Sequence, residues 1–222
     1  MSLSITTDLR DQLGPVRDQK TRPTCLAFAA SDAHQHAQNH EEEFSAEWIY
    51  YHAVLLAGGM HDEGSTIPNT RAIVSTPGQP VESAWPYLNE ITDVASWKPP
   101  VTTDLFQSST IEASVSDFDS TLDAETPIVT ALYISDAFYF YDQWTLSDGE
   151  VILPDDGSPV DTQRGHAVVV AGSANLHGSQ HFLLRNSWGS SWANEGHAWI
   201  GSVELERRLI GAFTVSIGAN YV

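Results

Sequence analysis

Residues 15–30 read PVRDQKTRPTCLAFAA and contain Cys25, the only cysteine of the 222-residue chain. A leucine and four alanines follow Cys25 at helical spacing, at positions 26, 29, 30, 33 and 37. This spacing predicts a helix over about residues 24–38 with one apolar face, and Pro23 and Thr24 are typical of a helix start, Thr24 because its hydroxyl can cap free amides. A cysteine at this end meets unpaired N–H groups and the positive pole of the helix, which favour the thiolate. A buried structural cysteine is the alternative interpretation.

Two distant motifs favour a catalytic cysteine. Gln19 lies six residues before Cys25, and His166 lies 141 residues after it, in GHAVVV at 165–170. Asn186 follows Cys25 by 161 residues, in HFLLRNSWGSSW at 181–192. In this order, the chain resembles the papain family of cysteine peptidases, whose motifs are a glutamine and a cysteine near the start, a histidine that opens a strand, and Asn-Ser-Trp-Gly. In the family, the histidine and the asparagine follow the cysteine by roughly 130–150 residues, so the interval from Cys25 to Asn186 is slightly long here.

The resemblance implies an α+β fold of two lobes with the active site in the cleft between them. We expect one papain-like domain over residues 1–222, with a helical lobe over about 19–105 and an antiparallel, β-barrel-like lobe over about 106–222. Residues 4–18 would form an N-terminal strap that runs across to the β-rich lobe. The residue patterns agree, because helical patterns precede the Lys-Pro-Pro at 98–100 and strand patterns follow it, which argues against a parallel α/β sheet.

The pattern also predicts where the individual elements lie. Beyond the first helix, we expect helices over about 45–57, 67–75 and 117–125. We expect strands at 111–115, 128–134, 166–172, 181–185, 197–200 and 212–217. Asp148-Gly149 and Asp156-Gly157 are typical of hairpin turns.

Cleavage of a peptide bond by a thiol needs a thiolate, a proton carrier, a group that orients the carrier and donors for the oxyanion. The resemblance assigns these roles to Cys25, His166, Asn186 and Gln19 in turn, with the backbone N–H of Cys25 as the second oxyanion donor. A thiolate–imidazolium pair would have a lowered thiol pKa and a raised imidazole pKa. Taken singly, His166 reads as a core histidine and Asn186 as a turn residue.

The resemblance also implies substrate contacts at four residues. Trp188 would shield the histidine–asparagine hydrogen bond from water, and Trp192 lies beyond it in the same motif. Gly64 would present its backbone to an extended substrate, with a plain loop glycine as the alternative. Pro23 stands where the family has a glycine beside the bound substrate, so it would narrow and stiffen that wall.

Cysteine usage and flanking segments bear on the compartment. One cysteine forbids an intrachain disulfide, which suits a reducing cytoplasm, although export by a non-classical route stays open. No stretch resembles a signal peptide or a membrane span. We expect a compact, disulfide-free member of bacterial type without a propeptide. Such a peptidase would be restrained by an inhibitory or regulatory protein partner, by its compartment or by narrow specificity.

The net charge of −19 argues against nucleic-acid binding, because phosphate contacts need a basic surface. It would either steer basic substrates to the protein or serve solubility alone. His34, His36 and His40 are interpreted as a solvated helix end, since no Cys or carboxylate completes a ligand set. We therefore expect neither a metal nor a cofactor.

The most specific hypothesis is a cysteine-type peptidase that hydrolyses peptides or proteins through a thioester acyl-enzyme. Two alternatives stay open: a related acyl transfer, as in a deamidase or transamidase, and a catalytically silent papain-like binding module. The oligomeric state and the physiological substrate are not indicated by the sequence.

Overall fold

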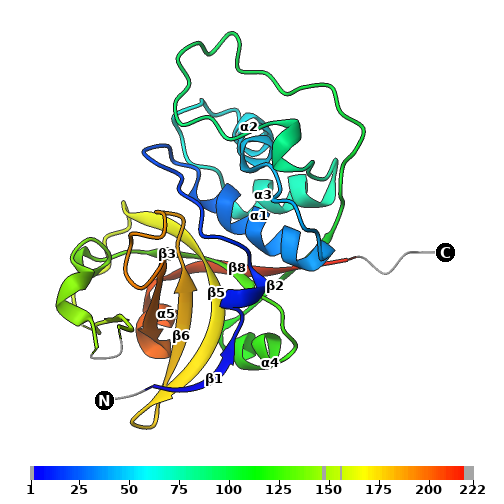
Figure 1. Ribbon diagram of the computed structural model, residues 1–222. Helices are drawn as coiled ribbons and strands as arrows, with labels where there is room; N and C mark the ends of the chain where they lie inside the picture. Colours follow the sequence, from blue (N-terminus) through cyan, green and yellow to red (C-terminus); the bar gives the residue numbers. More distant parts are fainter. Residues whose placement is uncertain (1–2, 147–148, 156, 218–222) are drawn as a thin grey trace.

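Helix α1 (Cys25–Gln38) lies where a helical lobe and a β-rich lobe meet (Figure 1). In this computed structural model, which describes residues 3–146, 149–155 and 157–217, α1 contacts two helices on one side and three strands on the other. Every residue from Leu26 to His34 is buried. The expectation of a single apolar face was therefore too narrow: the helix is enclosed, and its many alanines let both lobes approach closely.

The helical lobe packs α2 (Ala46–Leu56) and α3 (Ile67–Ser75) against α1. Both helices begin with a side-chain cap, because Ser45 Oγ accepts the Trp48 N–H at 3.1 Å and the Thr66 hydroxyl accepts the Asn69 N–H. Thr24 does not cap α1 with its side chain, so that prediction was wrong. Its Oγ1 lies 2.9 Å from the Tyr87 hydroxyl instead.

The β-rich lobe is built on an eight-stranded sheet with the order β2-β8-β3-β5-β6-β7-β4, and β1 pairs with β5 (Figure 1). The strands are β1 (Ser4–Asp8), β2 (Ser109–Glu112), β3 (Ile128–Tyr133), β4 (Ile152–Leu153), β5 (Gly165–Leu176), β6 (Ser179–Arg185), β7 (His197–Gly201) and β8 (Leu209–Ser216). All pairings are antiparallel except that of β4 with β7. Within the described residues β2 and β4 end the sheet without pairing to each other, so the lobe is barrel-like but not closed. The two-lobe α+β prediction is confirmed.

Several short elements complete the chain. They are α4 (Phe118–Asp123), α5 (Ser202–Arg208) and the 3-10 turns η1 (Arg10–Gln12), η2 (Glu82–Ala84), η3 (Val115–Asp117), η4 (Asp136–Phe138) and η5 (Tyr141–Trp144). Helix α5 and strand β4 were not expected, since both are too short for a clear periodic pattern. Gly149 and Gly157 have the positive φ expected in tight turns, but Asp148 and Asp156 lie outside the described residues.

A buried charged cluster joins the two lobes. Asp32 of α1 accepts from Arg17 Nη2 at 2.7 Å and from Arg185 Nε of β6 at 2.9 Å. Burial alone would raise the pKa of Asp32, but the two guanidinium groups hold it below its usual value. The cluster links the helix that begins at Cys25 to the residue directly before Asn186.

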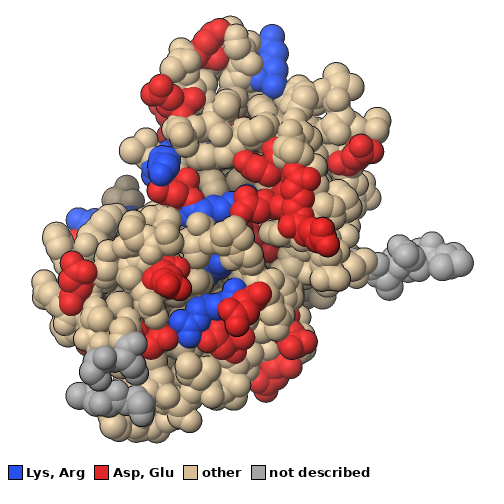
Figure 2. Space-filling view, viewed as in Figure 1, with Lys and Arg blue, Asp and Glu red and all other residues tan. Residues whose placement is uncertain are grey.

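The surface carries the acidic excess. Figure 2 shows Asp and Glu side chains over both lobes and along their boundary, where several Lys and Arg side chains also gather. Among the described residues, no helix is both long and apolar enough to cross a membrane.

Candidate active site

Cys25 is the first residue of α1 and lies against the start of β5. Burial raises the pKa of its thiol, while the backbone N–H groups of Ala167, Leu26 and Cys25 itself act in the opposite direction without reversing the shift. The Ala167 amide therefore lies beside the sulfur. Since Ala167 follows His166 in the chain, strand β5 places the predicted histidine one residue from the amide beside the sulfur.

His166 and Asn186 form a buried hydrogen bond. His166 Nε2 lies 2.7 Å from Asn186 Oδ1, and the two residues are 6% and 2% exposed. The same oxygen accepts the Ser187 N–H at 2.8 Å, which identifies it as an acceptor. His166 Nε2 must then carry the proton, so in the neutral ring Nδ1 is the free base. Asn186 Nδ2 is buried and has no hydrogen-bond partner among the described residues.

The pKa shifts of the thiol and the imidazole run opposite to those expected for a thiolate–imidazolium pair. Burial lowers the pKa of His166 to about 4, although the Asn186 hydrogen bond acts to raise it. Burial likewise raises the pKa of Cys25. Removing both groups from water favours their neutral forms, and this desolvation outweighs the helix start on which the sequence interpretation relied.

Aromatic rings cover the histidine. The Trp188 ring lies 4.7 Å from the His166 ring, centroid to centroid, and stacks on Tyr139 at 5.4 Å. Trp192 is only 5% exposed and donates its indole N–H to the Phe138 carbonyl at 2.8 Å. Trp188 is thus placed to shield the His166 ring, whereas Trp192 packs beneath the surface.

Gln19 is 6% exposed and is held by four hydrogen bonds, one of them from the Tyr87 hydroxyl to its backbone carbonyl at 2.7 Å. Its Oε1 accepts from Ser187 Oγ at 2.7 Å, its Nε2 donates to the Arg22 carbonyl at 2.8 Å, and its backbone N–H donates to the Ser187 carbonyl at 2.8 Å. One N–H of the carboxamide is thereby used, and the other is left for a ligand. Ser187 was not singled out from the sequence, although it lies inside the Asn-Ser-Trp-Gly motif.

The structure places the other two predicted substrate contacts on loops of the helical lobe. Pro23 is half-buried two residues before Cys25. Gly64 is exposed, and a Cβ built there would meet no atom within 4 Å, so local packing does not require glycine.

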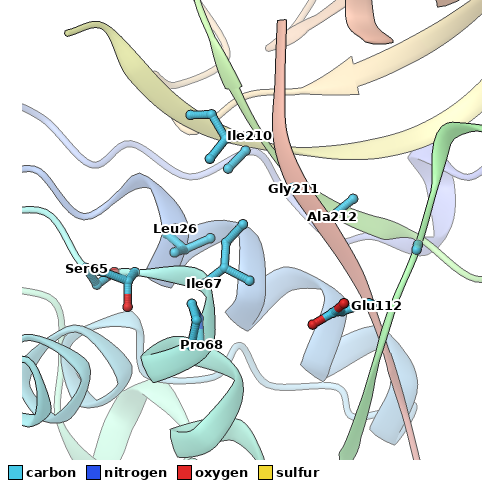
Figure 3. A pocket seen from close by; sticks show the side chains of 11 residues that line it. Leu26, Ser65, Ile67, Pro68, Glu112, Ile210, Gly211 and Ala212 are labelled. Atoms are coloured by element: carbon cyan, nitrogen blue, oxygen red, sulfur yellow. The ribbon is translucent and has the colours of Figure 1, made fainter. Parts of the chain in front are cut away.

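A pocket of about 560 Å³ lies between the lobes beside Leu26, the residue that follows Cys25 (Figure 3). Its helical-lobe wall is made by Leu26, Ser65, Thr66, Ile67 and Pro68, and its β-lobe wall by Glu112, Ala113, Ala131, Ile210, Gly211 and Ala212. The lining is mostly apolar, and Figure 3 shows the Glu112 carboxylate turned toward the helical-lobe wall. Sequence reasoning missed this pocket, because its walls come from segments that only the fold brings together.

The histidines near the end of α1 differ from the expectation. His34 is fully buried, and its Nδ1 lies 2.9 Å from Gln79 Oε1, so it is not part of a solvated helix end. His36 and His40 are half-buried. Over the residues that the structure describes, no group of three or more His, Cys, Asp or Glu side chains could hold a metal ion.

Comparison with known proteins relates this chain to cysteine proteases. Cathepsin K of Mus musculus is 52% identical over 33 residues, which make up 15% of this chain and 10% of that protein. Thiol protease aleurain of Arabidopsis thaliana is 23% identical over 220 residues, 96% of this chain and 59% of that protein. The chain therefore spans less than two thirds of the length of these relatives.

Solved structures with the same fold include xylellain, a cysteine protease from Xylella fastidiosa, with a TM-score of 0.77 and 20% identity over 98% of this chain and 88% of that one. Digestive procathepsin L 3 of the Tenebrio molitor larval midgut has a TM-score of 0.74 and 17% identity over 98% of this chain and 71% of that one. The family profile described as papain family cysteine protease matches residues 3–207. Because this match covers nearly the whole chain, the protein belongs to the papain family of cysteine proteases.

Proposed function

We propose that the protein is a peptidase in which Cys25, His166, Asn186 and Gln19 carry out the reaction. The observation that carries this proposal is the buried 2.7 Å hydrogen bond from His166 Nε2 to Asn186 Oδ1, because it leaves His166 Nδ1 free to act as a base. His166 directly precedes Ala167, whose backbone N–H lies beside the Cys25 sulfur. Family membership supports the same assignment.

In this mechanism the Cys25 sulfur attacks the peptide carbonyl carbon while His166 Nδ1 takes the thiol proton. The oxyanion accepts hydrogen bonds from the backbone N–H of Cys25 and from the second N–H of the Gln19 carboxamide. The imidazolium then gives its proton to the leaving nitrogen, the C–N bond breaks and a thioester remains. Water attacks the thioester with His166 as base, which releases the acid and restores the thiol.

The pKa shifts favour a neutral thiol and a neutral imidazole at rest. When the thiolate and the imidazolium form together during attack, each charge would stabilise the other and offset the cost of burying them. Asn186 supports this step, since its Oδ1 already accepts the Nε2 proton that the imidazolium retains.

The substrate is proposed to be an extended peptide segment of a protein. The pocket beside Leu26 would take an apolar side chain, because most of its lining is apolar. Gly64 and Pro23 would flank the substrate backbone, and Trp188 would contact the substrate beside His166, with Trp192 packed behind it. The single cysteine supports action in a reducing compartment such as the cytoplasm.

The test is incubation of wild-type protein and Cys25→Ala with a peptide library, followed by mass spectrometry. We expect cleaved peptides from the wild type and none from the variant. Conversion of glutamine to glutamate, or joining of peptides without cleavage, would identify another acyl transfer instead. Unchanged hydrolysis by folded Cys25→Ala would refute the proposed nucleophile, and an inert wild type would indicate a silent binding module.

A further inference from the structure

A buried ion pair lies beside the loop that carries Gln19. Arg22, in the loop before α1, donates from Nη1 to Glu47 Oε2 at 2.6 Å and from Nη2 to Glu47 Oε1 at 2.9 Å. Glu47 lies in the first turn of α2. The side chains of Arg22 and Glu47 are 7% and 0% exposed, so this bidentate contact is shielded from solvent.

The pair is fixed by further hydrogen bonds. Glu47 accepts the Trp97 indole N–H at 2.6 Å and the Leu88 N–H at 3.1 Å, and Arg22 Nη1 donates to the Leu88 carbonyl at 2.6 Å. The guanidinium also lies over the Tyr87 ring, 5.0 Å from its centroid. Contacts from α2 and from two later segments thus hold the Arg22 side chain in one orientation.

This cluster is connected directly to the proposed oxyanion donor. Gln19 Nε2 donates to the backbone carbonyl of Arg22 at 2.8 Å. The Tyr87 hydroxyl donates to the Gln19 carbonyl at 2.7 Å and lies 2.9 Å from Thr24 Oγ1. The Arg22 backbone carbonyl therefore helps to set where the Gln19 carboxamide points, together with the Ser187 hydroxyl on its oxygen.

We propose that Arg22 and Glu47 are positioning residues that hold the Gln19 carboxamide and the loop over residues 19–24 in the geometry needed for oxyanion stabilisation. This inference rests on the proposed function. The chain has no second cysteine that could pin the loop with a disulfide. A bidentate Arg–carboxylate contact has a planar, fixed geometry and so holds one orientation. Among the described residues, the buried Arg22 Nε has no hydrogen-bond partner, so the two terminal nitrogens of the guanidinium make the contacts that fix it.

The two residues are expected to act on kcat and little on KM. An oxyanion donor contributes mainly in the transition state, so misplacing it leaves ground-state binding of the peptide nearly unchanged. Neither Arg22 nor Glu47 lines the pocket beside Leu26. A purely structural ion pair would instead lower the melting temperature without changing kcat in the folded protein.

The test compares four variants well below their melting temperatures. Glu47→Gln removes one charge, the double variant Arg22→Met with Glu47→Leu removes both without leaving either unpaired, and Arg22→Lys keeps the charge but loses the planar fork. Glu204→Gln is the matched control, because Glu204 and Arg208 of α5 form another ion pair, at 2% and 1% exposure. We expect kcat to fall about 10- to 100-fold in the first two variants and less in Arg22→Lys, with KM within about threefold. The control keeps its kcat.

Two probes distinguish a change in oxyanion stabilisation from a change in the reactivity of the Cys25 sulfur. Iodoacetamide alkylates Cys25 without forming an oxyanion, so its rate should stay within about twofold of the wild type in every variant. A peptide aldehyde forms a tetrahedral adduct with an oxyanion, so its inhibition constant should rise in proportion to the loss of kcat.

Unchanged kcat in Arg22→Lys and in the double variant would overturn the inference, as would an alkylation rate that falls along with kcat. A wild-type protein that neither cleaves peptides nor reacts with iodoacetamide would instead refute the proposed function. Arg22→Lys retains the ion pair and is expected to fold, so the test does not depend on the stability of the other variants.

Discussion

The two sides of the cleft hold their site residues by different means. On the β side, His166 lies on β5 and Asn186 directly follows β6, and the pairing of these two strands brings the two residues together. On the helical side, Gln19 lies in a loop, and hydrogen bonds to the Arg22 backbone carbonyl and from the Tyr87 and Ser187 hydroxyls place it. Strand register follows from the hydrophobic pattern, whereas a polar network depends on residues far apart in the sequence.

The largest expected effect tests the β side alone. His166→Ala removes the base and should lower kcat/KM about 10³- to 10⁴-fold. Asn186→Ala leaves the histidine on its strand under Trp188, so its loss should be about tenfold smaller. Steady-state kinetics of both variants on one peptide decides the matter, with circular dichroism to verify folding. Equal losses would show that Asn186 does more than orient the ring.

The second prediction concerns Asp32, which joins the two sides through Arg17 and Arg185. Asp32→Asn leaves the buried Arg185 guanidinium without its carboxylate, while Arg17 keeps Glu82 and Glu43 at 3.8 and 3.9 Å. The substitution should lower the free energy of unfolding by about 3 kcal/mol. Urea denaturation at neutral pH measures this change. A loss below about 1 kcal/mol would mean that the two sides are held together mainly by apolar packing.

The third prediction uses a buried histidine from each side, His34 and His197. Burial lowers the pKa of both to about 4, from the usual 6.5. The unfolded chain therefore binds more protons between these values, and the free energy of unfolding should fall as the pH decreases from 6.5 to 4, by at most about 1.4 kcal/mol per pH unit for each histidine.

Urea denaturation across this pH range should give a shallower slope for His34→Gln and for His197→Gln than for the wild type. Identical slopes would show that these two histidines do not titrate differently on unfolding. A change in only one variant would locate the acid sensitivity on one side of the cleft.

The smallest expected effect is at Pro23, on the helical side. Pro23→Gly removes the ring beside the proposed substrate path, so kcat/KM for peptides with a bulky residue before the scissile bond should rise up to about tenfold relative to small residues. Paired peptides that differ only at this residue provide the measurement. An unchanged ratio would place Pro23 away from the substrate.

The sequence was most informative where periodicity and motifs coincide. The start of α1 at Cys25, the bounds of α3 and the strand that carries His166 all agree with the patterns. The sequence did not indicate which charged groups are buried. An acidic residue near a helix start, such as Glu47, is normally interpreted as a solvated side chain that interacts favourably with the helix dipole. The pocket beside Leu26 was missed as well, since Gly211 and Ile67 meet only through the long-range fold.

The loop over residues 19–24 is held by an ion pair, so the redox state of Cys25 does not affect how the loop is held. Where a disulfide holds such a loop, the reductant that keeps a catalytic thiol reduced can also break that disulfide. Here Arg22 and Glu47 are inert to thiols, and Cys25 is the only sulfhydryl that an oxidant or a reductant can address. Dithiothreitol should therefore activate oxidised protein to a plateau that persists at high concentration, so redox state would switch the reaction without loosening the fold.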